Sequence, residues 1–164
     1  MQAVRSHGTA TGYLRPIHCR PEMTPKPDYV LRTFIRCSQD ALWEALTAPE
    51  DAASYHPYTP EAVRDGDALV YKLPDGSDML VCRETSVTPK TRIEVEFAPK
   101  WAPNIPVSRF VWSIAPEGAF CALTLEHYDI PEGGEGYADG WERLVAGLKT
   151  WLETGTPARV GETA

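Results

Sequence analysis

His127 is the side chain best placed for acid–base chemistry. It follows Leu123 and Leu125 at every second residue of a strand-like run, so it shares their face and points toward the interior. A histidine in a cavity can work as a general acid or base. The alternative is a buried histidine that only hydrogen-bonds a neighbour, the ordinary state of buried polar groups. No Ser-His-Asp or Cys-His spacing with motif support accompanies it.

His56 is the second histidine of interest, because Tyr55 and Tyr58 flank it. This aromatic and histidine cluster either gates a pocket or packs on the rim of a sheet. A metal site needs three or four converging ligands, and the histidines offer no such spacing. We therefore expect neither a metal nor a cofactor. The strand carboxylates Glu94, Glu96 and Glu126 have outward parity, which predicts a solvated face rather than an acid–base pair.

Three tryptophans invite a ligand-binding interpretation. Trp112 and Trp141 either stack on a planar ligand across a cavity or pack in the core. Trp101 lies between Pro99 and Pro103 in a loop, where a core does not require it. We expect the loop from residue 98 to 106 to overhang one end of a cavity, with Trp101 closing it. Packing and a contact surface are the alternatives for this ring.

Short strands and one long helix would position these residues. Alternating apolar residues and turn signals predict strands over residues 29–36, 69–73, 79–87, 92–97, 110–114 and 123–127. Ser38 predicts the N-cap of a short helix to Thr47, and Pro49 opens a second short helix to about Ser54. The turn at 74–76 and the stretch at 116–119 predict two hairpins.

The C-terminal segment is the clearest helix. Its apolar residues recur along one face of a 3.6-residue period: Trp141, Leu144, Val145, Leu148 and Leu152. Asp139 is expected to cap its start, and Gly155 its end. Laying this helix across a curved antiparallel sheet buries both apolar faces and leaves a cavity between them.

Composition excludes several classes of function. The net charge of −7 provides no basic patch for nucleic acid, and no apolar run approaches the ~20 residues that span a bilayer. Four scattered cysteines favour reduced thiols in the cytoplasm.

Four prolines predict a disordered tail over residues 1–27, with Met23 as a plausible start. One domain is expected over 28–155, followed by a mobile tail over 156–164.

The chain resembles the bacterial relatives of the heat-shock protein 90 ATPase activator, within the START-like (SRPBCC, birch-pollen-allergen-like) superfamily. The matching positions are Phe34-Ile35, Trp43, Ala45-Leu46-Thr47, Pro49-Glu50, Thr124-Leu125, His127, Gly140-Trp141, Leu144, Leu148 and Lys149. The resemblance implies an α+β helix-grip fold: a curved antiparallel sheet wrapped around a long C-terminal helix, with two short helices after the first strand. The proline-rich segment from residue 100 to 106 departs from the usual family pattern.

Three functions remain open. The first is a cytoplasmic protein that binds a small apolar or aromatic ligand, as a monomer or weak homodimer. Its expected ligand-binding residues are Phe97, Trp101, Phe110, Trp112, Leu125, His127, Trp141, Leu144 and Leu148. The second is a cyclase- or hydrolase-type enzyme that uses His127 as acid or base. The third is a protein-interaction module, either a chaperone accessory or a partner of a transcriptional regulator, with an exposed apolar patch near Trp101 and Ile105.

Overall fold

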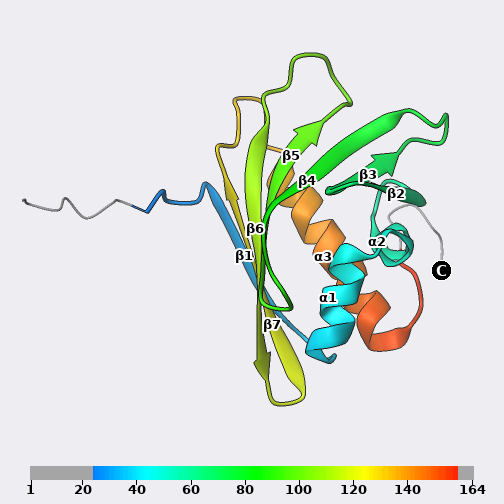
Figure 1. Ribbon diagram of the computed structural model, residues 1–164, viewed down its shortest axis with the longest axis vertical. Coiled ribbons are helices and arrows are strands. Elements are labelled where there is room, and N and C mark those ends of the chain that lie inside the picture. The colour runs from blue at the N-terminus through cyan, green and yellow to red at the C-terminus, as the bar shows by residue number, and fades with distance from the viewer. Residues whose placement is uncertain (1–23, 159–164) are drawn as a thin grey trace, which may run out of the picture.

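A curved antiparallel sheet encloses the C-terminal helix in the computed structural model, which describes residues 24–158 (Figure 1). In chain order the elements are β1 (Tyr29–Ile35), α1 (Gln39–Thr47), α2 (Pro49–Tyr55), β2 (Glu61–Asp65), β3 (Ala68–Lys72), β4 (Asp78–Thr88), β5 (Arg92–Pro99), β6 (Ser108–Glu117), β7 (Phe120–Tyr128) and α3 (Tyr137–Thr154). The sheet order is β1-β7-β6-β5-β4-β3-β2. The predicted sheet, long helix and two short helices after the first strand are confirmed. The tails predicted at 1–27 and 156–164 lie mostly outside the described residues and stay predictions.

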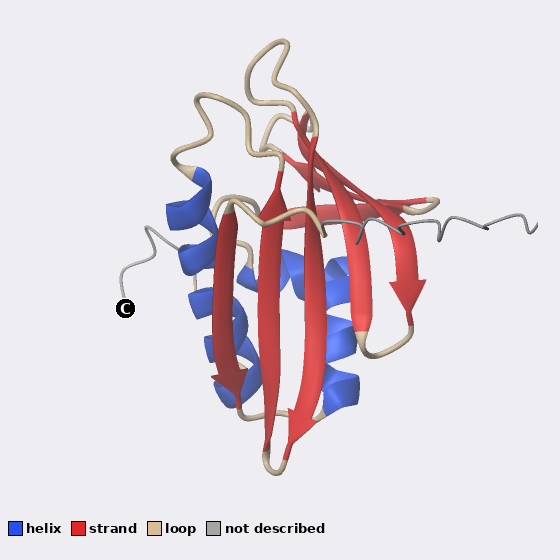
Figure 2. Ribbon diagram, turned by 90° about the vertical axis from the view of Figure 1, so that its left-hand side faces the viewer, coloured by secondary structure: helices blue, strands red, loops and turns tan. Residues whose placement is uncertain are grey.

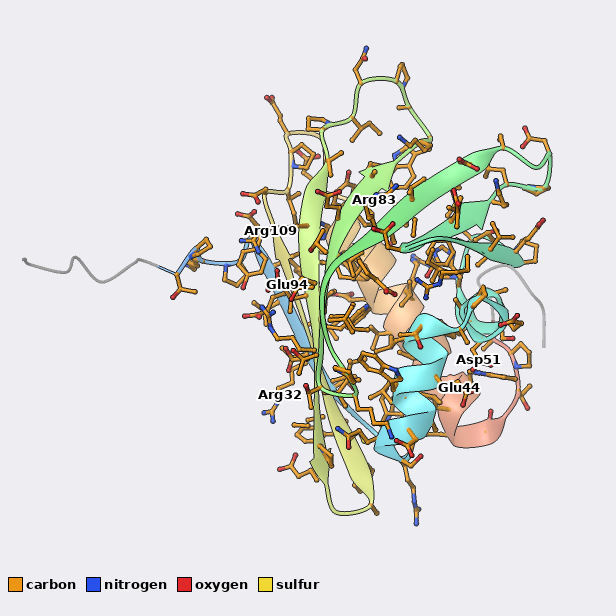
Figure 3. The ribbon with its side chains drawn as sticks, in the orientation of Figure 1. Arg32, Glu44, Asp51, Arg83, Glu94 and Arg109 are labelled. Atoms are coloured by element: carbon orange, nitrogen blue, oxygen red, sulfur yellow. The ribbon has the colours of Figure 1, made fainter. Side chains whose placement is uncertain are left out.

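The two faces of the sheet differ because apolar and polar residues alternate along the strands. In β5, Ile93, Val95 and Phe97 are buried on the concave face, whereas Arg92 and Glu96 are exposed. Figure 2 views the sheet from its outer face, with the helices behind the strands. On that outer face Arg32, Glu94 and Arg109 project away from the helices (Figure 3). The concave face therefore carries the core and any internal site.

The short helices α1 and α2 are held by specific backbone contacts. The Ser38 hydroxyl accepts a hydrogen bond from the Ala41 N–H at 3.1 Å, which confirms the predicted N-cap. The Ala45 carbonyl has no helical N–H four residues later, because residue 49 is proline. The Tyr55 hydroxyl donates to that carbonyl instead, at 2.7 Å. This bond ties the end of α2 to α1.

The helices also pack closely at one glycine of α3. A Cβ atom on Gly147 would lie 2.5 Å from the carbonyl oxygen of Tyr55, too close for a real contact. Glycine at this position lets the backbone of α2 rest directly on α3. This contact fixes the position of α2 against the long helix, and with it the position of Tyr55, which faces the interior.

Two details differ from the sequence-based expectation. Helix α3 begins at Tyr137, so Asp139 lies in its first turn, and its carboxylate pairs with Arg143 Nε at 2.7 Å rather than capping the helix. The prediction at the other end is confirmed, since Gly155 adopts a left-handed φ of 71°. Strand β2 was not predicted, because Ala62 and Val63 alone give a weak apolar pattern. None of the helices in the described part of the chain is long and apolar enough to span a bilayer.

Candidate functional site

A cavity of about 480 Å³ lies between α3 and the concave face of the sheet. Its walls come from β3 to β6, from α3, from the ends of α1 and α2, and from adjoining loops. Most of its lining is apolar or aromatic, and includes Leu46, Leu69, Tyr71, Leu73, Met79, Leu80, Ile93, Val95, Phe97, Phe110, Trp112, Trp141 and Leu144. Such a lining favours a ligand with a large apolar surface.

Six of the nine residues expected to bind a ligand line this cavity. They are Phe97, Trp101, Phe110, Trp112, Trp141 and Leu144. Five of the six follow from the alternation of β5 and β6 and from the apolar face of α3, which is the reason that the sequence pattern located them; Trp101 comes from the loop between β5 and β6. Their contact with a ligand stays a prediction.

Aromatic rings form most of one wall. The ring centroids of Phe110 and Trp141 are 4.9 Å apart, and those of Trp112 and Trp141 are 5.6 Å apart with an interplanar angle of 86°. Trp112 and Trp141 therefore contact each other directly, and their stacking on a ligand stays a prediction. Edge-to-face arrangements of this kind are favourable for packed aromatic rings.

Trp101 lies on the loop between β5 and β6, at the edge of the cavity. Its side chain is 50% exposed, yet its ring makes edge-to-face contacts with Phe97 at 6.1 Å and Tyr137 at 6.2 Å. The ring thus bridges the sheet and the start of α3. Its closure of the cavity over a ligand stays a prediction.

The other three expected site residues lie outside the lining. Leu125, His127 and Leu148 have no solvent exposure and are not among the residues that line the cavity. Their patterns pointed inward correctly, but all three side chains are fully buried in the core. The rings of Phe97 and Tyr137 pack against His127 at 5.1 and 5.5 Å.

Both ring nitrogens of His127 are engaged. The Trp141 indole N–H donates to His127 Nδ1 at 2.9 Å, and His127 Nε2 lies 2.8 Å from the Ser108 hydroxyl oxygen. Because an indole nitrogen can only donate, Nδ1 must be unprotonated. The proton of a neutral ring is therefore on Nε2, which donates to Ser108. This residue joins β6, β7 and α3.

Burial lowers the pKa of His127 to about 4, and the nearby charges of Asp28 and Asp129 only partly oppose this effect. The imidazole is neutral at pH 7 and has no exposed nitrogen. A general acid or base must reach the proton it transfers. In this arrangement His127 serves as a structural hydrogen-bonding residue, which argues against its use as the acid–base group of an enzyme.

Several lining residues were not among those predicted. Tyr55, His56 and Tyr58 do line the cavity, and the His56 ring packs on Tyr71 with centroids 4.4 Å apart. The sequence had left this cluster open between a gate and a rim contact. Tyr71 was overlooked altogether, although its parity with Leu69 in the predicted strand would have located it.

Among the described residues that line the cavity, Glu84 is the single carboxylate. Its Oε1 pairs with Arg64 Nη1 at 2.9 Å, and the same guanidinium donates to the Thr47 carbonyl. The guanidinium of this arginine therefore already has two acceptors, and Arg64 itself does not line the cavity. Across residues 24–158 no cluster of three or more His, Cys, Asp or Glu side chains could hold a metal ion.

A long helix held in a curved antiparallel sheet, with an apolar cavity between them, defines a protein of the helix-grip class. The chain belongs to the family described as Activator of Hsp90 ATPase homolog 1-like protein, whose family model matches residues 36–153. No curated protein sequence matches it significantly.

Solved structures share the fold at low sequence identity. CalU16 from Micromonospora echinospora is 20% identical with a TM-score of 0.61, and the match covers 79% of this chain and 75% of CalU16. The Aha1 dimer from Colwellia psychrerythraea is 15% identical with a TM-score of 0.62, over 77% of this chain and 96% of that one. DynU16, a protein in the dynemicin biosynthetic locus, is 22% identical with a TM-score of 0.62, over 80% of this chain and 49% of DynU16.

Proposed function

We propose that this protein binds a small apolar or aromatic molecule in the cavity between α3 and the sheet. The cavity itself carries the proposal. Its volume of about 480 Å³ falls within the range of small-molecule sites, and its lining is mostly apolar and aromatic. Burial of ligand surface there contributes roughly 25 cal/mol per Å². The free thiols of the described cysteines, Cys37, Cys82 and Cys121, support the cytoplasm as the compartment.

A thermal-shift screen tests this proposal. The panel contains flavonoids, fatty acids and polyketide-like aromatic ketones; the last class is included because the structurally similar DynU16 comes from a biosynthetic locus. A ligand at a hundred times its Kd stabilises the folded state by about 2.7 kcal/mol, which shifts the melting temperature by several degrees. A panel without any shift contradicts the proposal.

A matched pair of variants shows whether a ligand occupies this cavity. Leu144 lines the cavity from α3, whereas Leu152 lies two turns further along the same helix and is not part of the lining. Leu144→Trp is expected to fill the cavity and abolish the shift, and Leu152→Trp to retain it. Retention of the full shift in a folded Leu144→Trp variant would place the ligand elsewhere.

A protein-contact role is a second candidate, favoured by the exposed side chains of the loop between β5 and β6. Trp101 and Val107 are both at least half exposed, and Ile105 between them is partly exposed. The family description suggests an Hsp90-type chaperone as the partner. Stimulation of the ATPase of such a chaperone, lost in a Trp101→Ser, Val107→Ser double variant, would support this role. An ATPase rate unchanged by the wild-type protein would exclude it.

A further inference from the structure

Tyr71 brings a hydroxyl group without a hydrogen-bond partner among the described residues to the wall of the apolar cavity. Tyr71 lines the cavity from β3, is only 7% exposed, and has no hydrogen-bond partner for its hydroxyl within residues 24–158. Its neighbour Tyr55 cannot donate to it, because the Tyr55 hydroxyl donates to the Ala45 carbonyl. A buried hydroxyl without a partner is destabilising, so its presence calls for a partner that residues 24–158 do not supply.

The Tyr71 hydroxyl acts as a donor. Burial, followed by the proximity of Tyr55 and Cys82, raises its pKa well above the usual value of 10, and the charge of Arg64 only partly opposes this. The phenol therefore keeps its proton. The indole of Trp112, a second buried lining residue, is also a donor with no hydrogen-bond acceptor in the described part of the chain. Both groups call for an acceptor atom within the cavity.

The charge around the cavity decides what kind of acceptor fits. Among the described lining residues, Glu84 carries the one formal charge, a carboxylate. The nearby guanidinium of Arg64 is already paired with that carboxylate and with the Thr47 carbonyl. An anionic ligand would lose its hydration without gaining a cation. A neutral oxygen, as in a ketone, quinone or hydroxyl group, accepts a hydrogen bond without that cost.

We propose that Tyr71 is the polar anchor of the cavity and that the ligand is a neutral, oxygen-bearing planar aromatic molecule. This inference rests on the proposed function and narrows its ligand class. The Tyr71 hydroxyl donates to a ligand oxygen, while lining rings from β5 and α3, such as Phe97 and Trp141, contact the aromatic body of the ligand.

Fluorene and 9-fluorenone test the anchor, because the two are nearly identical in shape and differ in one carbonyl oxygen. Each is titrated into the full chain, with the fluorescence of the cavity tryptophans as the readout. In Tyr71→Phe the preference for fluorenone over fluorene is expected to fall roughly three- to tenfold, the effect of one hydrogen bond. The affinity for fluorene is expected to stay the same or to rise. Tyr128→Phe, which removes a phenol hydroxyl from outside the lining, should keep the wild-type preference.

The outcomes separate the two proposals. If both compounds bind and Tyr71→Phe keeps the fluorenone preference, the anchor is overturned while the cavity proposal stands. If neither compound binds the wild-type protein, the anchor and its planar ligand class are overturned, whereas the cavity proposal is still decided by the thermal-shift panel. A melting temperature of ligand-free Tyr71→Phe well below wild type would also overturn the anchor, because it would show that the hydroxyl is already satisfied. We expect fluorenone-2-carboxylate to bind more weakly than fluorenone. Equal or tighter binding of the carboxylate would overturn the inference that the ligand is neutral.

Discussion

The indole N–H of Trp141 donates a hydrogen bond to Nδ1 of His127 over 2.9 Å, joining α3 to β7 behind the cavity wall. This bond fixes the tautomer of the histidine and the orientation of the tryptophan together. The face that Trp141 offers to the cavity therefore depends on a residue that does not line it. His127, which the sequence suggested as an acid–base group, serves here to position an aromatic wall.

His127 should make the stability of the fold depend on pH. Burial lowers its pKa from 6.5 to about 4 in the folded state, so the unfolded chain binds the proton more readily between these values. The free energy of unfolding therefore falls as the pH drops through that window, by about 2 kcal/mol between pH 7 and pH 5 from this residue. Urea unfolding at both pH values measures it.

The matched control is His127→Gln, which keeps a side-chain acceptor and donor but does not titrate. Its stability should change less between pH 7 and pH 5 than that of the wild type, by the same ~2 kcal/mol. Parallel pH profiles for the two proteins would show that the buried imidazole is not the source of the dependence.

Two glycines of α3 predict opposite effects of the same substitution. Gly147→Ala would place a Cβ atom 2.5 Å from the Tyr55 carbonyl oxygen and push α2 off the helix, at a cost of about 1–3 kcal/mol. Gly140 has nothing within 4 Å of such an atom, so Gly140→Ala should gain up to about 1 kcal/mol of helix propensity. Chemical denaturation of both variants checks this; a stabilised Gly147→Ala would contradict the close contact.

Two tyrosines that line the same cavity predict a second contrast. Tyr55→Phe removes the donor to the Ala45 carbonyl, which Pro49 cannot replace, and should lower the free energy of unfolding by about 1–2 kcal/mol. Tyr71→Phe removes a hydroxyl without a partner among the described residues and should not lower it. Urea midpoints at neutral pH, measured without ligand, distinguish the two. Equal losses would mean that both hydroxyls are bonded in the protein.

Local periodicity predicted the long helix, most of the strands and much of the cavity, whereas the weakly patterned strand β2 escaped it. Alternation along β5 and β6 located Phe97, Phe110 and Trp112, and the 3.6-residue period of α3 located Trp141 and Leu144. These patterns specify the face on which a side chain lies, and the cavity occupies one such face.

How deeply a side chain on that face is buried cannot be predicted from the local sequence pattern. His127 and Leu125 share the inward parity, yet rings from β5 and α3 separate the histidine from the cavity. The role proposed for Tyr71 likewise cannot be inferred from the sequence, because it depends on the absence of an acceptor among the described residues of other strands and helices. Packing between distant segments decides both.

Trp101 and Trp141 provide the sharpest comparison, because both line the cavity but differ in burial. Trp141 is 6% exposed and packs against Phe110, Trp112 and His127, so Trp141→Ala should cost about 3–5 kcal/mol of stability through a core cavity.

Trp101 is half exposed on a loop with prolines on both sides, so Trp101→Ala should change stability by less than about 1 kcal/mol. The stiff loop loses little conformational entropy when it closes on a ligand, and removal of the ring should weaken fluorenone binding several-fold. Denaturation and fluorenone titration of both variants measure the two effects separately. Equal stability losses would show that Trp101 is an ordinary core residue, and unchanged fluorenone binding by a stable Trp101→Ala would show that the ring does not close the cavity.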